Sequence, residues 1–375
     1  MTPFAISTPP RILFGRGEAA KAPGLIRAFG ARGVVVHGAS PARAAWLVQD
    51  LGPGVLAIPC AAEPTLADLM AALRVARNHR PDWVAAIGGG ASLDLGKALA
   101  GLIPAPGDPM QHLEVVGQGL SLTAAPLPFV ALPTTSGTGA EVTRNAVIGL
   151  PEHGRKVSLR DERMIARLAI VDPALTDGCP WPVTLASGLD AVTQVIEPYV
   201  SNKATPYTDA LTRPVIGPGL AALLRLEAGE DAEARDRLAW TSLCGGLALS
   251  NAGLGAVHGF AGVIGGMTGA AHGAICGALL GPVLAANRAA AEGAARVKLD
   301  EVCGVLADVL GCTVVDAPAA LQTWARGAGL PGLAGLGVMP AMHGEIVAAA
   351  AGASSMKGNP VVLGTAVLRG VLEAA

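Results

Sequence analysis

The feature that most constrains the fold is the alternation of apolar, strand-like segments with amphipathic, helix-like segments between residues 33 and 173. The helical pattern, with apolar residues at helical spacing, covers 42–52 and 66–80. Strands that alternate with helices form βαβ units and a mostly parallel sheet. The strand-like segments are GVVVHGAS (33–40), VLAIPC (55–60), WVAAIGGG (83–90), PFVALPTT (128–135) and ARLAIVDP (166–173).

The pattern changes after Asp177, where long helical stretches replace the alternation. A chain of 375 residues exceeds what one compact core usually holds. Prolines and a glycine in 172–182 mark the boundary. We therefore predict an α/β dinucleotide-binding domain over 1–177 and an all-α domain over 178–375. The helical stretches are 184–201, 231–252, 273–311 and 318–330.

Composition excludes several classes of protein. The net charge of −2 argues against a nucleic-acid partner. We find no apolar run of membrane-spanning length and no signal peptide, and so expect a cytoplasmic protein that has no membrane partner. The six cysteines form no CxxC pair, which predicts reduced, buried thiols rather than disulfides or a thiolate metal site.

Two loops that follow predicted strands suit a dinucleotide. In the first, three glycines would let backbone N–H groups approach a pyrophosphate, and the helix that follows points its positive end at the anion. The second loop, 132–141, is rich in hydroxyl groups and glycines that could bond a ribose, a phosphate or a nicotinamide amide. Each could instead be an ordinary turn, but two such loops in one open sheet favour binding. The first loop contains Gly88, Gly89, Gly90 and Ser92.

Four polar residues between 190 and 272 are candidate metal ligands. Asp190 and Gln194 are four residues apart and share one face of a helix. His258 and His272 lie in a Gly/Ala-rich stretch that is almost free of charge. One carboxylate, one amide oxygen and two imidazoles provide three good ligands and one poor ligand for a divalent metal. Each histidine alone could equally be a satisfied core side chain.

These segments together resemble the iron-containing (group III) alcohol dehydrogenase family. GGGASLDLGKA at 88–98 is similar to the family's GGGSxxDxAK segment, and PTTSGTGAEVT at 133–143 to its second cofactor loop. The resemblance extends over essentially the whole chain and implies a dehydroquinate-synthase-like architecture, with nicotinamide and metal held between the two domains. Further matching segments are ILFGRG (12–17), EPT (63–65), AIVDPALT (169–176), GLDAVTQVIEPYVS (188–201), the His258/His272 pair and SMKGNP (355–360).

The resemblance assigns roles to individual residues of this chain. Gly88, Gly89, Gly90 and Ser92 would hold the pyrophosphate, and Asp94 the loop or the cofactor. Lys156 would approach the nicotinamide ribose. Asp190, His258 and His272 would bind Fe²⁺ or Zn²⁺, and they are the expected catalytic residues. Lining the adenine and nicotinamide regions would be Thr134, Thr135 and Thr138.

The chain departs from the family at three positions. Gln194 stands where a metal-binding histidine is usual, and an amide oxygen is a weaker ligand. Gly262 stands where many members carry a further histidine, so a proton relay through that side chain is absent. Gly38 stands where NAD-preferring members often place an aspartate that repels a 2′-phosphate. Ser40 and Arg43 follow it, which permits NADP and mildly favours it over NAD.

The resemblance implies an NAD(P)-dependent oxidoreductase that transfers hydride between nicotinamide and a small alcohol or aldehyde, with metal assistance, in a homodimer. One alternative is a metal-independent reductase similar to maleylacetate reductase. Such enzymes usually lack the aspartate found here at Asp190. Another is a non-catalytic dinucleotide-binding relative, suggested by Gln194 and Gly262. A dehydroquinate-synthase-like cyclase fits less well, because the second loop and the tail resemble the dehydrogenases.

Overall fold

The computed structural model describes residues 3–375, which group into two compact units. The first, here called the α/β unit, contains residues 8–135 and 139–177. The second, here called the helical unit, contains 178–375 together with 3–7 and 136–138. The N-terminal segment and the three residues 136–138 thus group with helices that lie much later in the sequence.

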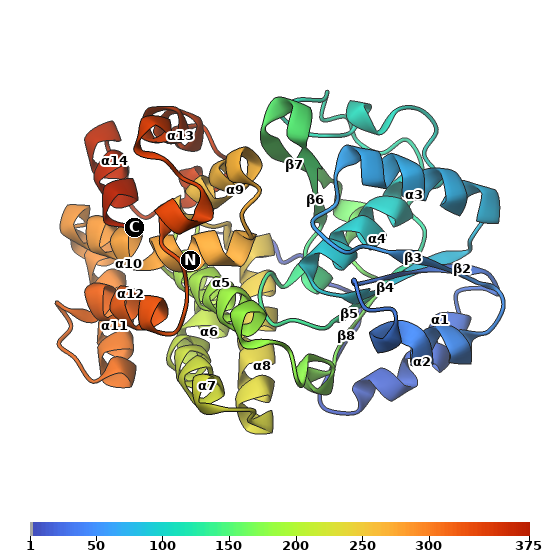
Figure 1. The fold of residues 1–375 in the computed structure, drawn as a ribbon, viewed down its shortest axis with the longest axis horizontal. Coiled ribbons are helices and arrows are strands. Elements are labelled where there is room, and N and C mark those ends of the chain that lie inside the picture. The colour runs from blue at the N-terminus through green and yellow to red at the C-terminus, as the bar shows by residue number, and fades with distance from the viewer. Residues whose placement is uncertain (1–2) are drawn as a thin grey trace. The chain divides into compact units, whose positions relative to one another are not determined.

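A six-stranded sheet forms the centre of the α/β unit (Figure 1). Its strand order is β1-β8-β5-β4-β2-β3, and every neighbouring pair is parallel. This confirms the predicted parallel sheet. The strands are β1 (Ile12–Phe14), β2 (Gly33–His37), β3 (Val55–Pro59), β4 (Trp83–Gly88), β5 (Phe129–Pro133) and β8 (Leu168–Val171).

Both faces of the sheet are covered by helices, as the continuous apolar strands require. Val34 and Val36 of β2 pack into the core under α3 and α4, whereas Val35 packs on the opposite face with α1 and α2. Figure 1 shows the two helix pairs on opposite sides of the sheet. Their bounds are α1 (Ala22–Arg27), α2 (Ala42–Leu51), α3 (Leu66–His79) and α4 (Gly90–Leu102).

An antiparallel hairpin outside the main sheet was not indicated by the sequence. It pairs β6 (Asn145–Leu150) with β7 (Arg155–Arg160). On β6, Ala146, Ile148 and Leu150 are buried and alternate with less buried residues. This period of two is the pattern of a strand with one face on the core. Its partner β7, with the sequence RKVSLR, is too polar to stand out beside the five apolar strands.

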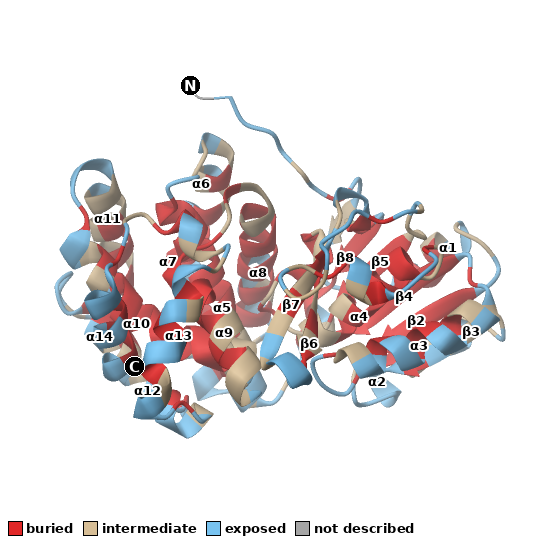
Figure 2. Cartoon of the chain, turned by 90° about the horizontal axis from the view of Figure 1, so that it is seen from above, coloured by how far each residue is buried: buried red, intermediate tan, exposed pale blue. Residues whose placement is uncertain are grey.

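The helical unit is built around α5 (Trp181–Val200), which packs against α7, α8 and α10. Figure 2 shows α5 as largely buried along its length, and its residues from Gly188 to Val200 are all buried. The other helices are α6 (Pro206–Thr212), α7 (Ile216–Ala228), α8 (Ala232–Ala252), α9 (Ala256–Thr268), α10 (His272–Ala290), α11 (Gly293–Leu310), α12 (Ala317–Gly327), α13 (His343–Ala351) and α14 (Thr365–Ala374).

The predicted helix over 273–311 is two helices, so that expectation was wrong. The helical conformation is interrupted between α10 and α11, where Glu292 is extended and Gly293 adopts φ +55°. Alanines on both sides of the break favour a helix, and they conceal the interruption in the sequence.

Among the described residues 3–375, one helix has the length and apolar composition that a membrane span would need. This is α10, and 67% of the apolar window is buried inside the structure. Burial of this kind is typical of a core helix, and α10 also packs against α5, α9 and α12. Its apolar character therefore has an explanation in the packing of the helical unit.

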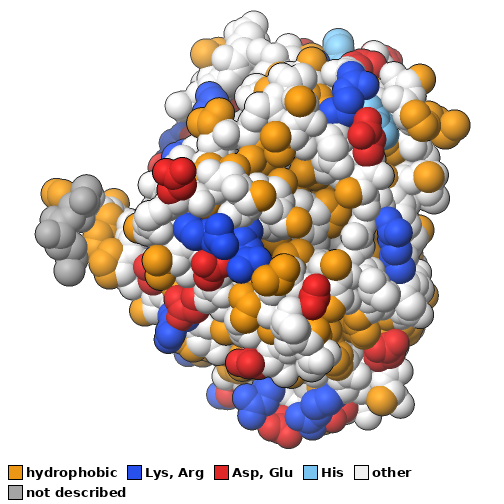
Figure 3. Space-filling model, turned by 90° about the vertical axis from the view of Figure 1, so that its left-hand side faces the viewer, with side chains coloured by type: hydrophobic (Ala, Val, Ile, Leu, Met, Phe, Trp, Pro, Cys, Tyr) orange, Lys and Arg blue, Asp and Glu red, His pale blue; other side chains and the backbone are white. Residues whose placement is uncertain are grey.

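Charged side chains on the helical unit are largely paired. Arg225 contacts Asp231 and Glu233, and Arg237 contacts Glu233. On the face drawn in Figure 3, basic side chains lie beside acidic ones. That face therefore shows no extended surface of one sign.

Candidate functional site

Three of the four predicted metal ligands, Asp190, His258 and His272, come together inside the helical unit. Asp190 and Gln194 lie one turn apart on α5, and both are buried. His258 lies in the first turn of α9, and His272 is the first residue of α10. Three helices thus bring side chains to one place from positions up to 82 residues apart in the chain.

The distances within this group suit a metal ion. Asp190 Oδ1 lies 3.3 Å from Nε2 of His258 and 3.7 Å from Nε2 of His272. The two imidazole rings are 5.3 Å apart between centroids. A tetrahedral ion with bonds of about 2.0–2.2 Å separates its ligand atoms by roughly 3.3–3.6 Å. The two separations from Asp190 therefore lie within about 0.1 Å of those that a tetrahedral divalent ion requires.

Asp190 carries the clearest sign that something else binds here. Among the described residues 3–375, its Oδ1 is the one buried side-chain oxygen or nitrogen that has no hydrogen bond. A carboxylate oxygen that is only 1% exposed and has no hydrogen bond is costly unless positive charge lies beside it, and a metal ion or the protonated imidazoles 3.3 and 3.7 Å away would supply that charge. The residues present therefore fit a metal on grounds that do not depend on any family.

The electrostatics of the group also favour a cation. Burial disfavours charge on His258, but Cys276, Asp190 and Glu197 outweigh it and raise the pKa of that imidazole well above its ordinary value. Burial likewise opposes the charge on His272, and Cys276 and Asp190 again raise its pKa. A field that favours positive charge on two buried imidazoles also favours a bound cation, which would take the place of those protons.

Glu197, which the sequence analysis missed, orients His258. Its Oε2 accepts from Nδ1 of His258 at 2.7 Å, and its Oε1 accepts from the backbone N–H of Val257 at 2.7 Å. Nε2 is therefore the nitrogen left to face Asp190. A carboxylate behind a ligating imidazole is a common arrangement at metal sites. The sequence could have indicated Glu197 through its spacing, because it follows Asp190 by two helical turns and so lies on the same face of α5.

Asn359, in the tail motif at 355–360, connects two helices of the candidate site. Its Oδ1 accepts from the backbone N–H of Ala256 and from Nδ2 of Asn287, and its own Nδ2 donates to Oδ1 of Asn287. These bonds join the start of α9 to α10, the two helices that carry the histidines. At Gly255 an added Cβ would lie 2.8 Å from Glu197 Oε1, so a side chain there would disturb the same junction.

Gln194 is held by a hydrogen bond of its own. Its Nε2 donates to the backbone carbonyl of Thr138 at 2.6 Å. Ser242 Oγ donates to the neighbouring carbonyl of Gly137 at 3.2 Å, which secures the segment 136–138 in the helical unit. The predicted metal role of Gln194 and the predicted cofactor role of Thr138 remain predictions.

Cys276 is the second residue that the sequence analysis missed. It lies one turn after His272 on α10, with Sγ 3.6 Å from Nε2 of His272 and 3.9 Å from Nε2 of His258. Ligand atoms of Cys276, Asp190 and the two histidines all lie within 4.8 Å of one another. The spacing of four from His272 was visible in the sequence, but the search for CxxC pairs passed over it.

In the α/β unit, the predicted cofactor residues gather where β2, β4 and β5 end. The backbone N–H of Thr134 donates to the carbonyl of Gly88 at 2.9 Å. An added Cβ at Gly88 would lie 2.4 Å from Ser92 Oγ, and one at Gly89 would lie 3.2 Å from Thr135 Oγ1. Parallel strands that end at one edge place these loops together, as phosphate-binding sheets require. The glycines therefore form a tight backbone cradle of the kind that suits a pyrophosphate.

The helix after this cradle is anchored by a buried lysine. Gly90 and Ser92 are in the first turn of α4, and Asp94 follows one turn later. Lys97 is fully buried and donates to the carbonyls of Ala140 and Asn145 and to Thr143 Oγ1. Burial lowers the pKa of Lys97 to about 8, against the effect of nearby Asp94 and Glu141. Lys97 therefore ties α4 to the segment that follows the second loop.

The remaining cofactor candidates lie around the same edge. Lys156 on β7 pairs with Glu63 in the loop after β3, with 2.5 Å between Nζ and Oε2. Gly38 ends the strand β2, and an added Cβ there would lie 3.9 Å from Ser92 Oγ. Ser40 is exposed, as is Arg43, whose guanidinium donates to the carbonyl of Leu175.

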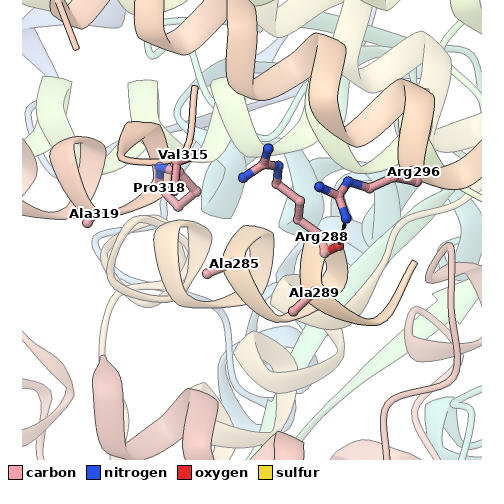
Figure 4. Close-up of a pocket in the computed structure, with 7 residues that line it drawn as sticks. All are labelled: Ala285, Arg288, Ala289, Arg296, Val315, Pro318 and Ala319. Carbon is pink, nitrogen blue, oxygen red and sulfur yellow. Dashed lines mark hydrogen bonds between the residues drawn. The ribbon is translucent and has the colours of Figure 1, made fainter. Parts of the chain in front are cut away.

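A separate hollow on the helical unit contains none of these residues (Figure 4). Two of its lining residues, Arg288 and Arg296, share the carboxylate of Asp300, and Arg296 also donates to the carbonyl of Arg288. Their charges are therefore engaged by the protein. The hollow is lined by Ala285, Arg288, Ala289, Arg296, Val315, Pro318 and Ala319.

Two stretches of the chain match known protein families. Residues 9–173 match the iron-containing alcohol dehydrogenase family, and residues 184–375 match the C-terminal domain of the Fe-containing alcohol dehydrogenase family. The chain belongs to the iron-containing alcohol dehydrogenase family. The segments on which this family was inferred from the sequence lie within the two matched regions, apart from the stretch 174–183 between them.

Individual members of the iron-containing alcohol dehydrogenase family are similar to this chain over different lengths. The probable alcohol dehydrogenase EutG of Escherichia coli (strain K12) is 38% identical over 54% of this chain and 51% of its own length. The NAD-dependent methanol dehydrogenase of Bacillus methanolicus is 33% identical over 71% of each chain. The chain spans about half the length of most of the curated relatives that it matches.

A solved structure of a family member covers nearly the whole chain. The crystal structure of a 1,3-propanediol oxidoreductase has a TM-score of 0.88 and 25% sequence identity, and it covers 99% of both chains. The architecture of a parallel-sheet domain followed by a helical domain is therefore the family's own, as the sequence predicted.

Proposed function

We propose that this chain is an NAD(P)-dependent, metal-assisted alcohol dehydrogenase or aldehyde reductase that acts on a small substrate. The observation that carries the proposal is the unpaired Oδ1 of Asp190, buried between two imidazoles in a member of this family. Asp190, His258 and His272 would hold the divalent metal, Fe²⁺ or Zn²⁺. When bound, the metal supplies Lewis acidity toward the oxygen of the substrate.

The cofactor residues support the same proposal. Gly88, Gly89, Gly90 and Ser92 would hold the pyrophosphate at the start of α4, and Thr134 and Thr135 lie against this cradle. Hydride chemistry belongs to the nicotinamide, so the protein's part is to bind and orient it. We further propose NADP as the favoured cofactor, because Gly38 offers no carboxylate to repel a 2′-phosphate and Arg43 is exposed nearby.

Proton movement would follow another route than in many relatives. Gly262 lies one turn after His258 on α9 and has no side chain. The resemblance places a histidine at this position in many members, so no imidazole relay operates here. Water, a ribose hydroxyl or the substrate would move the proton. We also propose that the protein is a cytoplasmic homodimer.

The test combines metal analysis with turnover. Protein purified without chelator would be analysed for metal and assayed for NADH and NADPH oxidation against a panel of small aldehydes. The assay would be repeated after EDTA and after readdition of Fe²⁺ or Zn²⁺. We expect near-stoichiometric metal, EDTA-sensitive reduction and faster turnover with NADPH. Metal-free protein that reduces an enoate such as maleylacetate would favour the metal-independent alternative, and cofactor binding without any turnover would favour the non-catalytic one.

A further inference from the structure

Asp190, His258 and His272 would provide three ligands to the metal, and the fourth protein ligand has still to be identified. Gln194 replaces the histidine of the family, and its Nε2 is committed to the carbonyl of Thr138 at 2.6 Å. This hydrogen bond holds the nitrogen of the Gln194 amide against the segment 136–138. The other end is a neutral oxygen, which is a poor ligand for Fe²⁺ or Zn²⁺.

Cys276 places a better donor beside the same three ligands. Its Sγ lies 3.6 Å from Nε2 of His272 and 3.9 Å from Nε2 of His258. An ion bound by nitrogen at about 2.0–2.1 Å and by sulfur at about 2.3 Å separates those atoms by roughly 3.5–3.6 Å in a tetrahedron. The separations in the structure agree with this within a few tenths of an ångström.

Two further observations support a ligand role for Cys276. Asp190 Oδ1, the buried oxygen without a hydrogen bond, lies among the same atoms. The case for a cation in this group therefore does not depend on Cys276. Cys276 is also the only one of the six cysteines in the cluster, and it is fully buried. Because His272 and Cys276 are one turn apart on α10, the helix itself sets their common orientation.

We propose that the thiolate of Cys276, rather than the amide of Gln194, is the fourth protein ligand of the divalent metal. The thiol proton leaves to solvent when the metal binds. The inference rests on the proposed function in one respect, namely that a divalent metal binds to Asp190, His258 and His272. A donor set with one sulfur, two nitrogens and one oxygen favours Zn²⁺ or Co²⁺ over Mg²⁺ or Mn²⁺.

The experiment is a Co²⁺ titration of the metal-free protein, because a thiolate bound to Co²⁺ gives a near-ultraviolet charge-transfer band. It compares the wild type with Cys276→Ala, Gln194→Ala and Cys303→Ala. Cys303 is a buried cysteine on α11 and serves as the matched control. We expect the band in all proteins except Cys276→Ala. A lost ligand should cost at least what a lost supporting residue does, so Co²⁺ affinity of that variant should fall about 10- to 100-fold.

Each other outcome has a definite meaning. Wild type that binds Co²⁺ without the band overturns the inference and leaves the proposed function standing. Wild type that binds neither Co²⁺ nor Zn²⁺ overturns both. A Gln194→Ala variant that loses metal as severely as Cys276→Ala restores the amide to the ligand set and also overturns the inference.

A second measurement needs no variant and so does not depend on how well Cys276→Ala folds. X-ray absorption at the zinc edge of the Zn²⁺-loaded wild type should show one sulfur neighbour at about 2.3 Å. A first shell of nitrogen and oxygen alone would exclude Cys276 from the site.

Discussion

Glu197 accepts a hydrogen bond from Nδ1 of His258 at 2.7 Å, and this contact determines which nitrogen of the imidazole faces Asp190. With the proton held on Nδ1, the lone pair of Nε2 is free for a cation. The same carboxylate accepts from the N–H of Val257 at the start of α9. One side chain therefore both positions the helix and sets the tautomer of its histidine.

Glu197→Gln should weaken metal binding by about 10- to 100-fold, as is typical when a residue that supports a ligating histidine is changed. The glutamine oxygen can still accept from Val257, but its NH₂ group would donate to Nδ1 and move the imidazole proton to Nε2. Metal affinity would be measured by competition with a chelating dye, and unfolding of the metal-free protein would be followed in parallel. Glu345→Gln, at an exposed position on α13, is the control. Equal affinity in both variants would show that Glu197 does not orient the ligand.

Gly88→Ala should reduce both dinucleotide affinity and stability. The added Cβ would lie 2.4 Å from Oγ and 2.6 Å from Cβ of Ser92, so the cradle must shift, at about 1–3 kcal/mol of unfolding free energy. NADPH binding by fluorescence and urea unfolding would measure the two effects. Gly304→Ala is the matched control, because its added Cβ meets nothing within 4 Å and the change should stabilise α11 by about 0.5–1 kcal/mol. Unchanged NADPH binding in Gly88→Ala would remove this glycine from the proposed phosphate site.

Lys97→Met should destabilise the α/β unit by about 3 kcal/mol or more. The two side chains have similar volumes, but two buried acceptors, on Ala140 and Thr143, and a partly buried one on Asn145 would lose their donor. Urea unfolding monitored by circular dichroism would give the change. Lys21→Met, at a lysine whose side chain is 59% exposed, should change stability by less than about 0.5 kcal/mol. Similar losses in the two variants would contradict the anchoring role of Lys97.

Asp161 should make stability depend on pH in the acid range. Hydrogen bonds from Arg163, helped by the N–H of Leu122, lower the pKa of Asp161 from 3.8 to about 2. A carboxylate whose folded pKa is depressed contributes stability above about pH 4, and this contribution disappears as the pH falls toward 2. Because Arg163 is partly exposed, we expect at most about 2 kcal/mol. Asp161→Asn should therefore flatten the decline in urea stability between pH 5 and pH 3. Parallel declines for wild type and variant would rule out this contribution.

The sequence was sufficient for those parts of the fold whose signals are local. Val34 to Val36 and the glycines after β4 carry their own strand and turn patterns, and the parallel sheet followed from their order. Asp190, His258 and His272 could be predicted as candidate ligands because few polar side chains interrupt that part of the chain. Cys276 and Glu197 were missed because each becomes informative only when helical spacing is combined with tertiary placement.

Other features depended on contacts between distant residues. The pairing of β1 with β8 joins segments about 157 residues apart, which no local pattern reveals. The hydrogen bond from Gln194 to the carbonyl of Thr138 likewise joins two motifs that look independent in the sequence. The break before Gly293 was hidden by alanines that favour a helix on both sides.

The short segment 136–138 has a consequence for how the protein can be made and divided. Its residues are synthesised before α5 and α8, yet the carbonyls of Thr138 and Gly137 are bonded by Gln194 and Ser242 of those helices. A fragment that starts at Gly178 would lack both acceptors, so the side chains of Gln194 and Ser242 would lose these hydrogen bonds. During translation, the hydrogen bonds that hold the loop 132–141 at Gly137 and Thr138 can form only after Gln194 and Ser242 have left the ribosome. The order of biosynthesis thus delays completion of this loop until the helical part of the chain exists.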